Sequence, residues 1–143
     1  MEEILDEKTY EAREVQYASF TARSAAFLID ILLLLMVTYG LYVMFGSAPS
    51  YADALREYWW QGILIIFFYF TYLEGSEMNA TFGKQVMDIR LLDETRRDIN
   101  FAIAAKHLLF SVLLFIGYFR MMKDPKRQTL ADKICQVLVI NVK

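Results

Sequence analysis

The stretch SAAFLIDILLLLMVTYGLYVMFG, residues 24–46, decides the fold of this chain. It carries a single charged residue, Asp30. A helix rising about 1.5 Å per residue over this length crosses a hydrocarbon layer of about 30 Å. The residues before it are acidic, which is not typical of a cleaved signal peptide. We therefore predict a first membrane-spanning helix over residues 24–46.

The rest of the composition agrees with a membrane protein. The chain has 143 residues, of which 57% are hydrophobic and 22% charged, and its mean hydropathy is +0.30. It has room for one domain, residues 1–143, and is too apolar for disorder. The net charge of -2 does not indicate a nucleic-acid-binding protein. A single cysteine and a single histidine have no metal-site spacing, so we expect no metal and no cofactor.

A second span is predicted over residues 58–74. Trp59 to Leu73 is uncharged, and tryptophan and tyrosine stand near its two ends, where amphipathic rings favour the membrane interface. A third apolar segment covers residues 101–119, but Lys106 and His107 lie within it. The predicted fold class is an all-α integral membrane protein with two spanning helices and this third helical segment, re-entrant or spanning. A basic tail, residues 120–143, follows.

Charge and strand patterns favour re-entry of the third segment. Outside the three segments the sequence has three basic residues before the first, one and four in the two loops, and six after the third, with Arg23 counted before the first. Three crossings divide them seven against seven; two crossings divide them thirteen against one, with the N-terminus and tail in the cytoplasm. Residues 86–92 (VMDIRLL) and 136–142 (QVLVINV) also resemble strands. Their pairing as a small cytoplasmic β element needs an even number of crossings. The alternative is three plain spanning helices.

Asp30 needs a partner, because a carboxylate inside a membrane helix costs about 2.5 to 3.5 kcal/mol. Arg23 lies two turns earlier on the same helix face, too far for a direct bond, so both groups would reach a third one: Lys106, His107 or water. One interpretation is an ion or proton relay in which Asp30 titrates. The other is a structural ion pair between helices.

The loop after the second span offers a smaller candidate site, formed by Thr81, Gly83 and Lys84. Lys84 would meet a lipid phosphate or a carboxylate. The alternative is a helix-ending turn with Gly83 in the left-handed conformation. The basic tail predicts contact with anionic lipid headgroups. The acidic N-terminal segment, residues 1–17, is either a short cytoplasmic helix for a partner or a frayed end.

Three motifs in order resemble the RDD family of membrane proteins, named for one arginine and two aspartates. They are YASFTARSAAFLID (residues 17–30), ATFGKQVMDIRLLD (80–93) and RQTLADKICQVLVI (127–140). The resemblance implies that Arg23, Asp30 and Asp132 are the naming residues. The chain departs from the family pattern at Asp88, where the family has glycine, and at Ala131, where it has histidine. Some members of the family are linked to cation/proton antiport.

These observations lead to two expected functions. The first is a small multi-pass protein of the bacterial inner membrane, with a structural or accessory role, working as a homo-oligomer or with a membrane-protein partner. The second is a cation/proton transporter in which Asp30 titrates and Arg23 or Lys106 tunes it. An enzyme is not expected, because the sequence shows no nucleophile with a base and no phosphate-binding loop.

Overall fold

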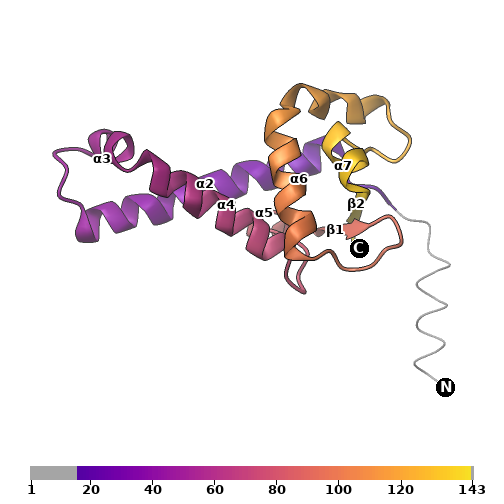
Figure 1. Ribbon diagram of the computed structural model, residues 1–143, viewed down its shortest axis with the longest axis horizontal. Coiled ribbons are helices and arrows are strands. Elements are labelled where there is room, and N and C mark those ends of the chain that lie inside the picture. The colour runs from indigo at the N-terminus through magenta and orange to yellow at the C-terminus, as the bar shows by residue number, and fades with distance from the viewer. Residues whose placement is uncertain (1–15, 143) are drawn as a thin grey trace, which may run out of the picture.

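The computed structural model describes residues 16–142, so most of the acidic segment 1–17 lies outside the described residues. The protein consists of a long helical arm and a compact head (Figure 1). The described elements, in chain order, are α2 (Phe20–Phe45), α3 (Tyr51–Glu57), α4 (Trp59–Glu74), α5 (Phe82–Val86), β1 (Ile89–Asp93), α6 (Phe101–Leu113), the 3-10 helix η1 (Phe115–Lys123), α7 (Leu130–Cys135) and β2 (Val137–Asn141).

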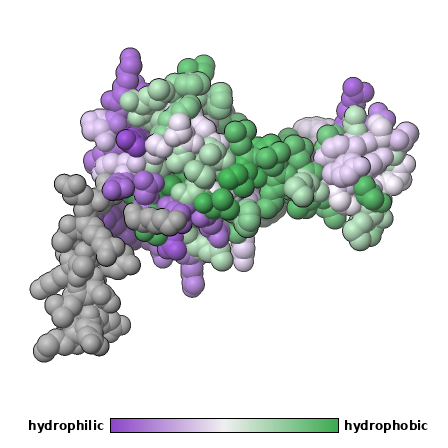
Figure 2. Space-filling view, turned by 180° about the vertical axis from the view of Figure 1, so that it is seen from behind, coloured by the Kyte–Doolittle hydropathy of each residue, from purple (hydrophilic) through white to green (hydrophobic). Residues whose placement is uncertain are grey.

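The arm is formed by α2 and α4, with α3 at its tip (Figure 1). The predicted helix over 24–46 is present and begins four residues earlier, because the Ser19 side chain accepts a hydrogen bond from the Ala22 amide and caps it. Taken singly, α2 is the one helix among residues 16–142 that is long and apolar enough to cross a membrane. The helix α4, predicted over 58–74, has 16 residues and is shorter than a typical span. Figure 2 shows a continuous apolar surface along the arm.

The third apolar segment, predicted over 101–119 as re-entrant or spanning, is helical but bent, which fits a re-entrant segment or a broken span. Helix α6 ends at Leu113, and the chain turns by 95° into η1. The bend brings η1 against α7. Gly117 and Met121 of η1 are buried, and the Leu130 side chain of α7 lies where a β-carbon on Gly117 would stand. Figure 1 shows α6 running across the arm rather than along it.

The two stretches predicted to pair form an antiparallel two-stranded sheet. Leu91 lies opposite Val139, and the register runs from the Ile89–Asn141 pair to the Asp93–Val137 pair. The segment before α2 extends this sheet, since the Ala18 amide donates to the Val139 carbonyl and Tyr17 forms a bridge with Ile140. The sheet thus ties together three parts of the chain that are far apart in sequence.

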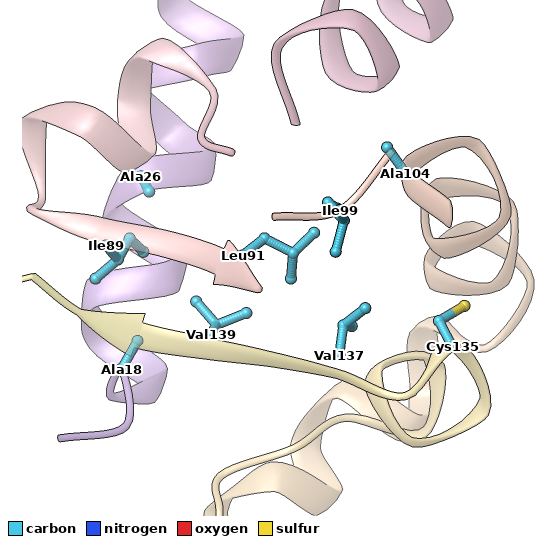
Figure 3. Close-up of a cluster of buried hydrophobic side chains, with 9 residues drawn as sticks. All are labelled: Ala18, Ala26, Ile89, Leu91, Ile99, Ala104, Cys135, Val137 and Val139. Atoms are coloured by element: carbon cyan, nitrogen blue, oxygen red, sulfur yellow. The ribbon is translucent and has the colours of Figure 1, made fainter. Parts of the chain in front are cut away.

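The hydrophobic core lies in the head, between the sheet, α2 and α6. Four large side chains of the sheet are essentially inaccessible to solvent: Ile89, Leu91, Val137 and Val139. Figure 3 shows Leu91 and Val137 near Ile99, and Ile89 at the other end of the sheet near Ala18 and Ala26. Full burial of such a side chain stabilises a fold by about 1.5 to 3 kcal/mol. Residues 120–143 are therefore more than a basic tail, because α7 and β2 belong to this core.

Candidate functional site

The charged residues predicted from the sequence gather at the junction of arm and head, in two separate clusters. We call the first the Asp30 site; it contains Asp30, Tyr69, Thr81 and Gly83. We call the second the ionic chain; it runs through Arg23, Asp132, His107, Glu74 and Lys84. The prediction that Arg23 and Asp30 share a third group is wrong. Arg23 donates to Asp132 in the ionic chain, whereas Asp30 accepts only from donors of the Asp30 site.

In the Asp30 site, neutral donors surround a buried carboxylate. Asp30 is only 1% exposed. Its Oδ1 accepts hydrogen bonds from the Tyr69 hydroxyl and the Gly83 amide, both at 2.7 Å, and its Oδ2 accepts one from the Thr81 hydroxyl at 2.6 Å. These three bonds satisfy the carboxylate; the Thr81 and Gly83 bonds fasten the start of α5 to α2, and the Tyr69 bond fastens α4 to α2.

The loop motif fits this geometry residue by residue. Thr81 caps α5: its hydroxyl oxygen accepts a hydrogen bond from the Lys84 amide. The same hydroxyl donates a hydrogen bond to Asp30. Gly83 is not left-handed as predicted; among residues 16–142 no glycine has a positive φ. Glycine is needed there because a β-carbon would lie 2.0 Å from the Ala26 carbonyl oxygen of α2. The motif therefore permits close packing of α5 against α2.

The ionic chain links five helices. Arg23 of α2 donates to Asp132 of α7 at 2.6 Å and to the Arg127 carbonyl at 2.7 Å. His107 of α6 lies between the two carboxylates, with Nε2 2.8 Å from Asp132 and Nδ1 3.5 Å from Glu74. Lys84 of α5 completes the chain by donating to Glu74 of α4 at 2.6 Å. Basic and acidic side chains thus alternate along the chain and close the junction.

A capping box at the start of α7 positions the Asp132 carboxylate for its contacts with Arg23 and His107. Thr129 and Asp132 form a capping box at the start of α7, in which the Thr129 amide donates to Asp132 Oδ2 at 2.9 Å. Burial on its own would raise the pKa of Asp132, but the Arg23 charge and the His107 hydrogen bond outweigh it and hold that pKa well below its ordinary value. The carboxylate is therefore ionised at neutral pH.

The structure brings together seven of the eight residues predicted as site residues: Arg23, Asp30, Thr81, Gly83, Lys84, His107 and Asp132. Lys106 is the exception. It is exposed, with its Nζ 6.0 Å from the centre of the Phe110 ring, and takes no part in the ionic chain. Of the two partners proposed for Lys84, the structure contains the carboxylate, Glu74.

Sequence reasoning missed Glu74 and Tyr69 as site residues. A signal for Glu74 is present, since it is the first charge after a run of uncharged residues in α4. Tyr69 gives no such signal, because a tyrosine at the end of an apolar helix is expected at the membrane interface anyway. Along residues 16–142 no group of three His, Cys, Asp or Glu side chains is arranged to hold a metal ion.

The long apolar helix α2 is a candidate membrane span, and the ionic chain connects the helices at its head end. The sequence pattern of the RDD family matches residues 17–136, and the chain belongs to this family of membrane proteins. Two curated relatives, each called a proline-rich antigen homolog and each from a strain of Mycobacterium tuberculosis, are 27% identical over 86 residues. That match covers 57% of this chain and 35% of each relative, so the chain spans about a third of their length. No solved structure matches.

Proposed function

We propose that this protein is a structural or accessory component of a membrane assembly, and that its buried arginine and aspartates hold its fold rather than carry ions. The observation behind this proposal is the state of Asp30. Its two oxygens accept three short hydrogen bonds from neutral donors, in a position that is 1% exposed. A carboxylate satisfied in this way has no need of a transported ion.

The surroundings of Asp30 support the same proposal. A relay in a membrane needs a polar or water-filled pathway that leads to the titrating group. Two clefts of the described part of the chain lie away from Asp30, one beside the start of β1 and one at the tip of the arm. Neither has a residue of the Asp30 site or the ionic chain in its wall.

We further propose a multi-pass topology in the bacterial inner membrane, in which α2 and α4 cross and the head lies in the cytoplasm. Three observations support it: the pairing of β1 with β2, the crosswise course of α6, and the placement of basic residues. Among residues 16–142, Arg56 is the one basic residue at the tip, whereas the eleven others are in the head or at the end of α2 beside it, which is the bias expected for the cytoplasmic side.

Lipids and a second protein are the proposed partners. Phe115, Ile116, Phe119 and Met122 of η1 are exposed, Ile116 at 89%, and Arg120 and Lys123 stand beside them. This combination fits the interface of a membrane with anionic headgroups. The exposed apolar faces of α2 and α4 are available to another copy of the chain or to another membrane protein. No enzymatic activity is proposed.

The competing function is a cation/proton transporter that uses Asp30. The feature in its favour is Asp30 itself, an ionisable side chain buried in α2. The ionic chain, in which His107 contacts the carboxylates of Asp132 and Glu74, adds a second group of buried ionisable side chains.

Proton and sodium flux in proteoliposomes distinguishes the two functions, with wild type, Asp30→Asn and the exposed control Glu57→Gln reconstituted at equal density. We expect no flux above empty vesicles in any sample. We also expect Asp30→Asn to unfold at lower temperature than Glu57→Gln. The Asn side-chain nitrogen cannot accept a hydrogen bond, so one of the three donors to Asp30 loses its partner, which costs about 1 to 3 kcal/mol of stability. Flux that is present in wild type and lost in a stably folded Asp30→Asn protein would contradict the proposal.

A further inference from the structure

We infer that His107 carries a proton on both ring nitrogens in the folded protein, that this imidazolium joins α6 to α4 and α7, and that loss of one proton loosens α6 from α4. The inference is independent of the proposed function, because it concerns how α6 is held at the junction and not whether an ion crosses the membrane.

Both ring nitrogens of His107 face a carboxylate. Nε2 lies 2.8 Å from Oδ1 of Asp132 in α7, and Nδ1 lies 3.5 Å from Oε2 of Glu74 in α4. A neutral imidazole has one N–H and one lone pair, so in either tautomer a lone pair would face one of these oxygens. An imidazolium donates from both nitrogens and avoids that repulsion. The geometry therefore favours the doubly protonated ring.

Other cations keep the two carboxylates charged. Arg23 donates to Oδ2 of Asp132, and Lys84 donates to Oε1 of Glu74, both at 2.6 Å. Each cation thus contacts the oxygen that His107 does not use. A nearby positive charge favours an ionised carboxylate. A proton shared between His107 and either carboxylate is therefore held by the ring.

The remaining ionisable groups on the helices around His107 do not compete for these contacts. The Cys135 thiol of α7 is buried, and burial raises its pKa, so it is uncharged at neutral pH. The other basic side chains of α6, η1 and α7 are exposed, and none forms a salt bridge with His107 in the described part of the chain: Lys106, Arg120, Lys123 and Lys133.

The balance of burial and charge agrees with the geometry. Burial on its own would lower the pKa of His107, but the hydrogen bonds and charges of Asp132 and Glu74 outweigh it and hold that pKa above its ordinary value. The unfolded chain has the ordinary value of about 6.5. The stability that His107 contributes is therefore fully present below about pH 6.5 and is lost as the pH rises through the folded pKa.

Loss of one proton affects the two contacts of His107 unequally. The remaining N–H stays on Nε2, because its contact with Asp132 is a hydrogen bond of 2.8 Å. Nδ1 then presents a lone pair to the ionised Glu74, and both side chains are buried. What still holds α6 to α4 is apolar packing, such as that of the Phe67 and Phe101 rings. The contact between α6 and α4 is therefore the one that weakens.

The charge on the ring is measured directly, because His107 is the only histidine of the chain. Histidine labelled with nitrogen-15 gives ring signals from this residue alone in the untagged full-length protein in lipid nanodiscs. At about pH 7.5 a free imidazole is about nine-tenths neutral. We expect both ring nitrogens of the folded protein to show the chemical shifts of N–H groups at this pH. One protonated and one unprotonated nitrogen would overturn the inference.

Spin labels measure the contact between α6 and α4. Ile63→Cys and Leu109→Cys, in the Cys135→Ala background, place labels at exposed positions of the two helices. His107→Gln has one donor and one acceptor, like a neutral imidazole. We expect this variant to shift the distance between the labels to longer values and to broaden its distribution. Lys106→Gln removes the neighbouring exposed charge and is the matched control, with an unchanged distance.

The wild-type distance should follow the protonation of the ring between about pH 6 and about pH 9, where lysine and arginine stay charged and carboxylates ionised. It should stay constant while both nitrogens carry protons and lengthen at the pH where one proton is lost. This series remains decisive if His107→Gln does not fold. A distance that changes while the ring keeps both protons, or that stays constant after one is lost, would overturn the inference. So would a wild-type distance in a folded His107→Gln protein.

Discussion

Asp30 and Asp132 are both buried carboxylates, but different chemistry stabilises them. Asp30 accepts hydrogen bonds from two hydroxyls and one amide, whereas Asp132 faces a guanidinium and an imidazole. The sequence indicates that each needs a partner, because a lone charge in a membrane is costly. It does not identify the partners, since Arg23 and Asp132 are 109 residues apart and many folds could bring other pairs together.

Gly83→Ala tests the close approach of α5 and α2. The added β-carbon would lie 2.0 Å from the Ala26 carbonyl oxygen, so one backbone has to move. We expect a loss of about 1 to 3 kcal/mol, as for other overpacked sites, seen as a lower unfolding temperature in detergent. Gly40→Ala, where a β-carbon meets nothing within 4 Å, is the matched control and should not be destabilised. An unchanged unfolding temperature for Gly83→Ala would contradict the described packing.

Asp132 predicts a pH dependence of stability. Its pKa is lower in the folded protein than in the unfolded chain, so the unfolded chain binds more protons as the pH falls. The stability that Asp132 contributes is fully present above the unfolded value of about 3.9 and is lost below it as the pH falls toward the folded pKa. Thermal unfolding measured between about pH 6 and about pH 3 should show this loss.

The variant Asp132→Asn should be less stable than wild type at neutral pH, by about 3 to 5 kcal/mol, because it leaves Arg23 buried without its ion partner. It should also lose part of the acid dependence. A wild-type and a variant curve that fall in parallel with pH would assign the acid sensitivity to other groups.

Among the elements, the strands were predictable and the break after α6 was not. Runs such as QVLVINV favour strands through their β-branched residues, and their pairing follows because a lone strand leaves its backbone unsatisfied. The apolar run 101–119, in contrast, has no proline and no polar interruption near Leu114. The break is accompanied by packing of η1 on α7, in which Gly117 lies against Leu130, a residue outside the run.

A cysteine pair tests the strand register. Arg90 and Ile140 are directly opposite each other in β1 and β2. With Cys135→Ala as background, Arg90→Cys with Ile140→Cys should form a disulfide under mild oxidation, because opposite positions in an antiparallel pair have β-carbons about 4.5 to 5.5 Å apart. Arg90→Cys with Asn141→Cys is the control, since Asn141 points to the other face of the sheet. Equal cross-linking of both pairs would contradict the register.

At the scale of the whole molecule, the protein divides into an apolar arm and a charged head. The sequence predicts this division well. Apolar residues dominate 24–46 and 58–74, and most charged residues lie outside these two ranges. It predicts less about how the head is built. Lys106 and Glu74 illustrate why: Lys106 lies within an apolar segment and is exposed, whereas Glu74 ends an apolar segment and is buried in the ionic chain.

The proposed topology predicts opposite accessibility for the two ends of the arm. In the Cys135→Ala background, Ser47→Cys lies in the turn at the tip and Thr95→Cys in the turn after β1, and both positions are exposed. In intact bacterial cells, a membrane-impermeant maleimide should label Ser47→Cys and leave Thr95→Cys unlabelled until the cells are lysed. Labelling of both positions in intact cells, or only of Thr95→Cys, would contradict the topology.

The pairing of Arg23 with Asp132 has a consequence for biosynthesis. Arg23 leaves the ribosome 109 residues before its partner, so at about 5 to 20 residues per second the arginine exists for about 5 to 20 s without it. During that interval α2 enters the bilayer with an unpaired guanidinium close to its first turn. A long side chain at that position is able to extend back to the headgroups. In the proposed topology, the arrival of α7 then pairs this arginine with Asp132 inside the head.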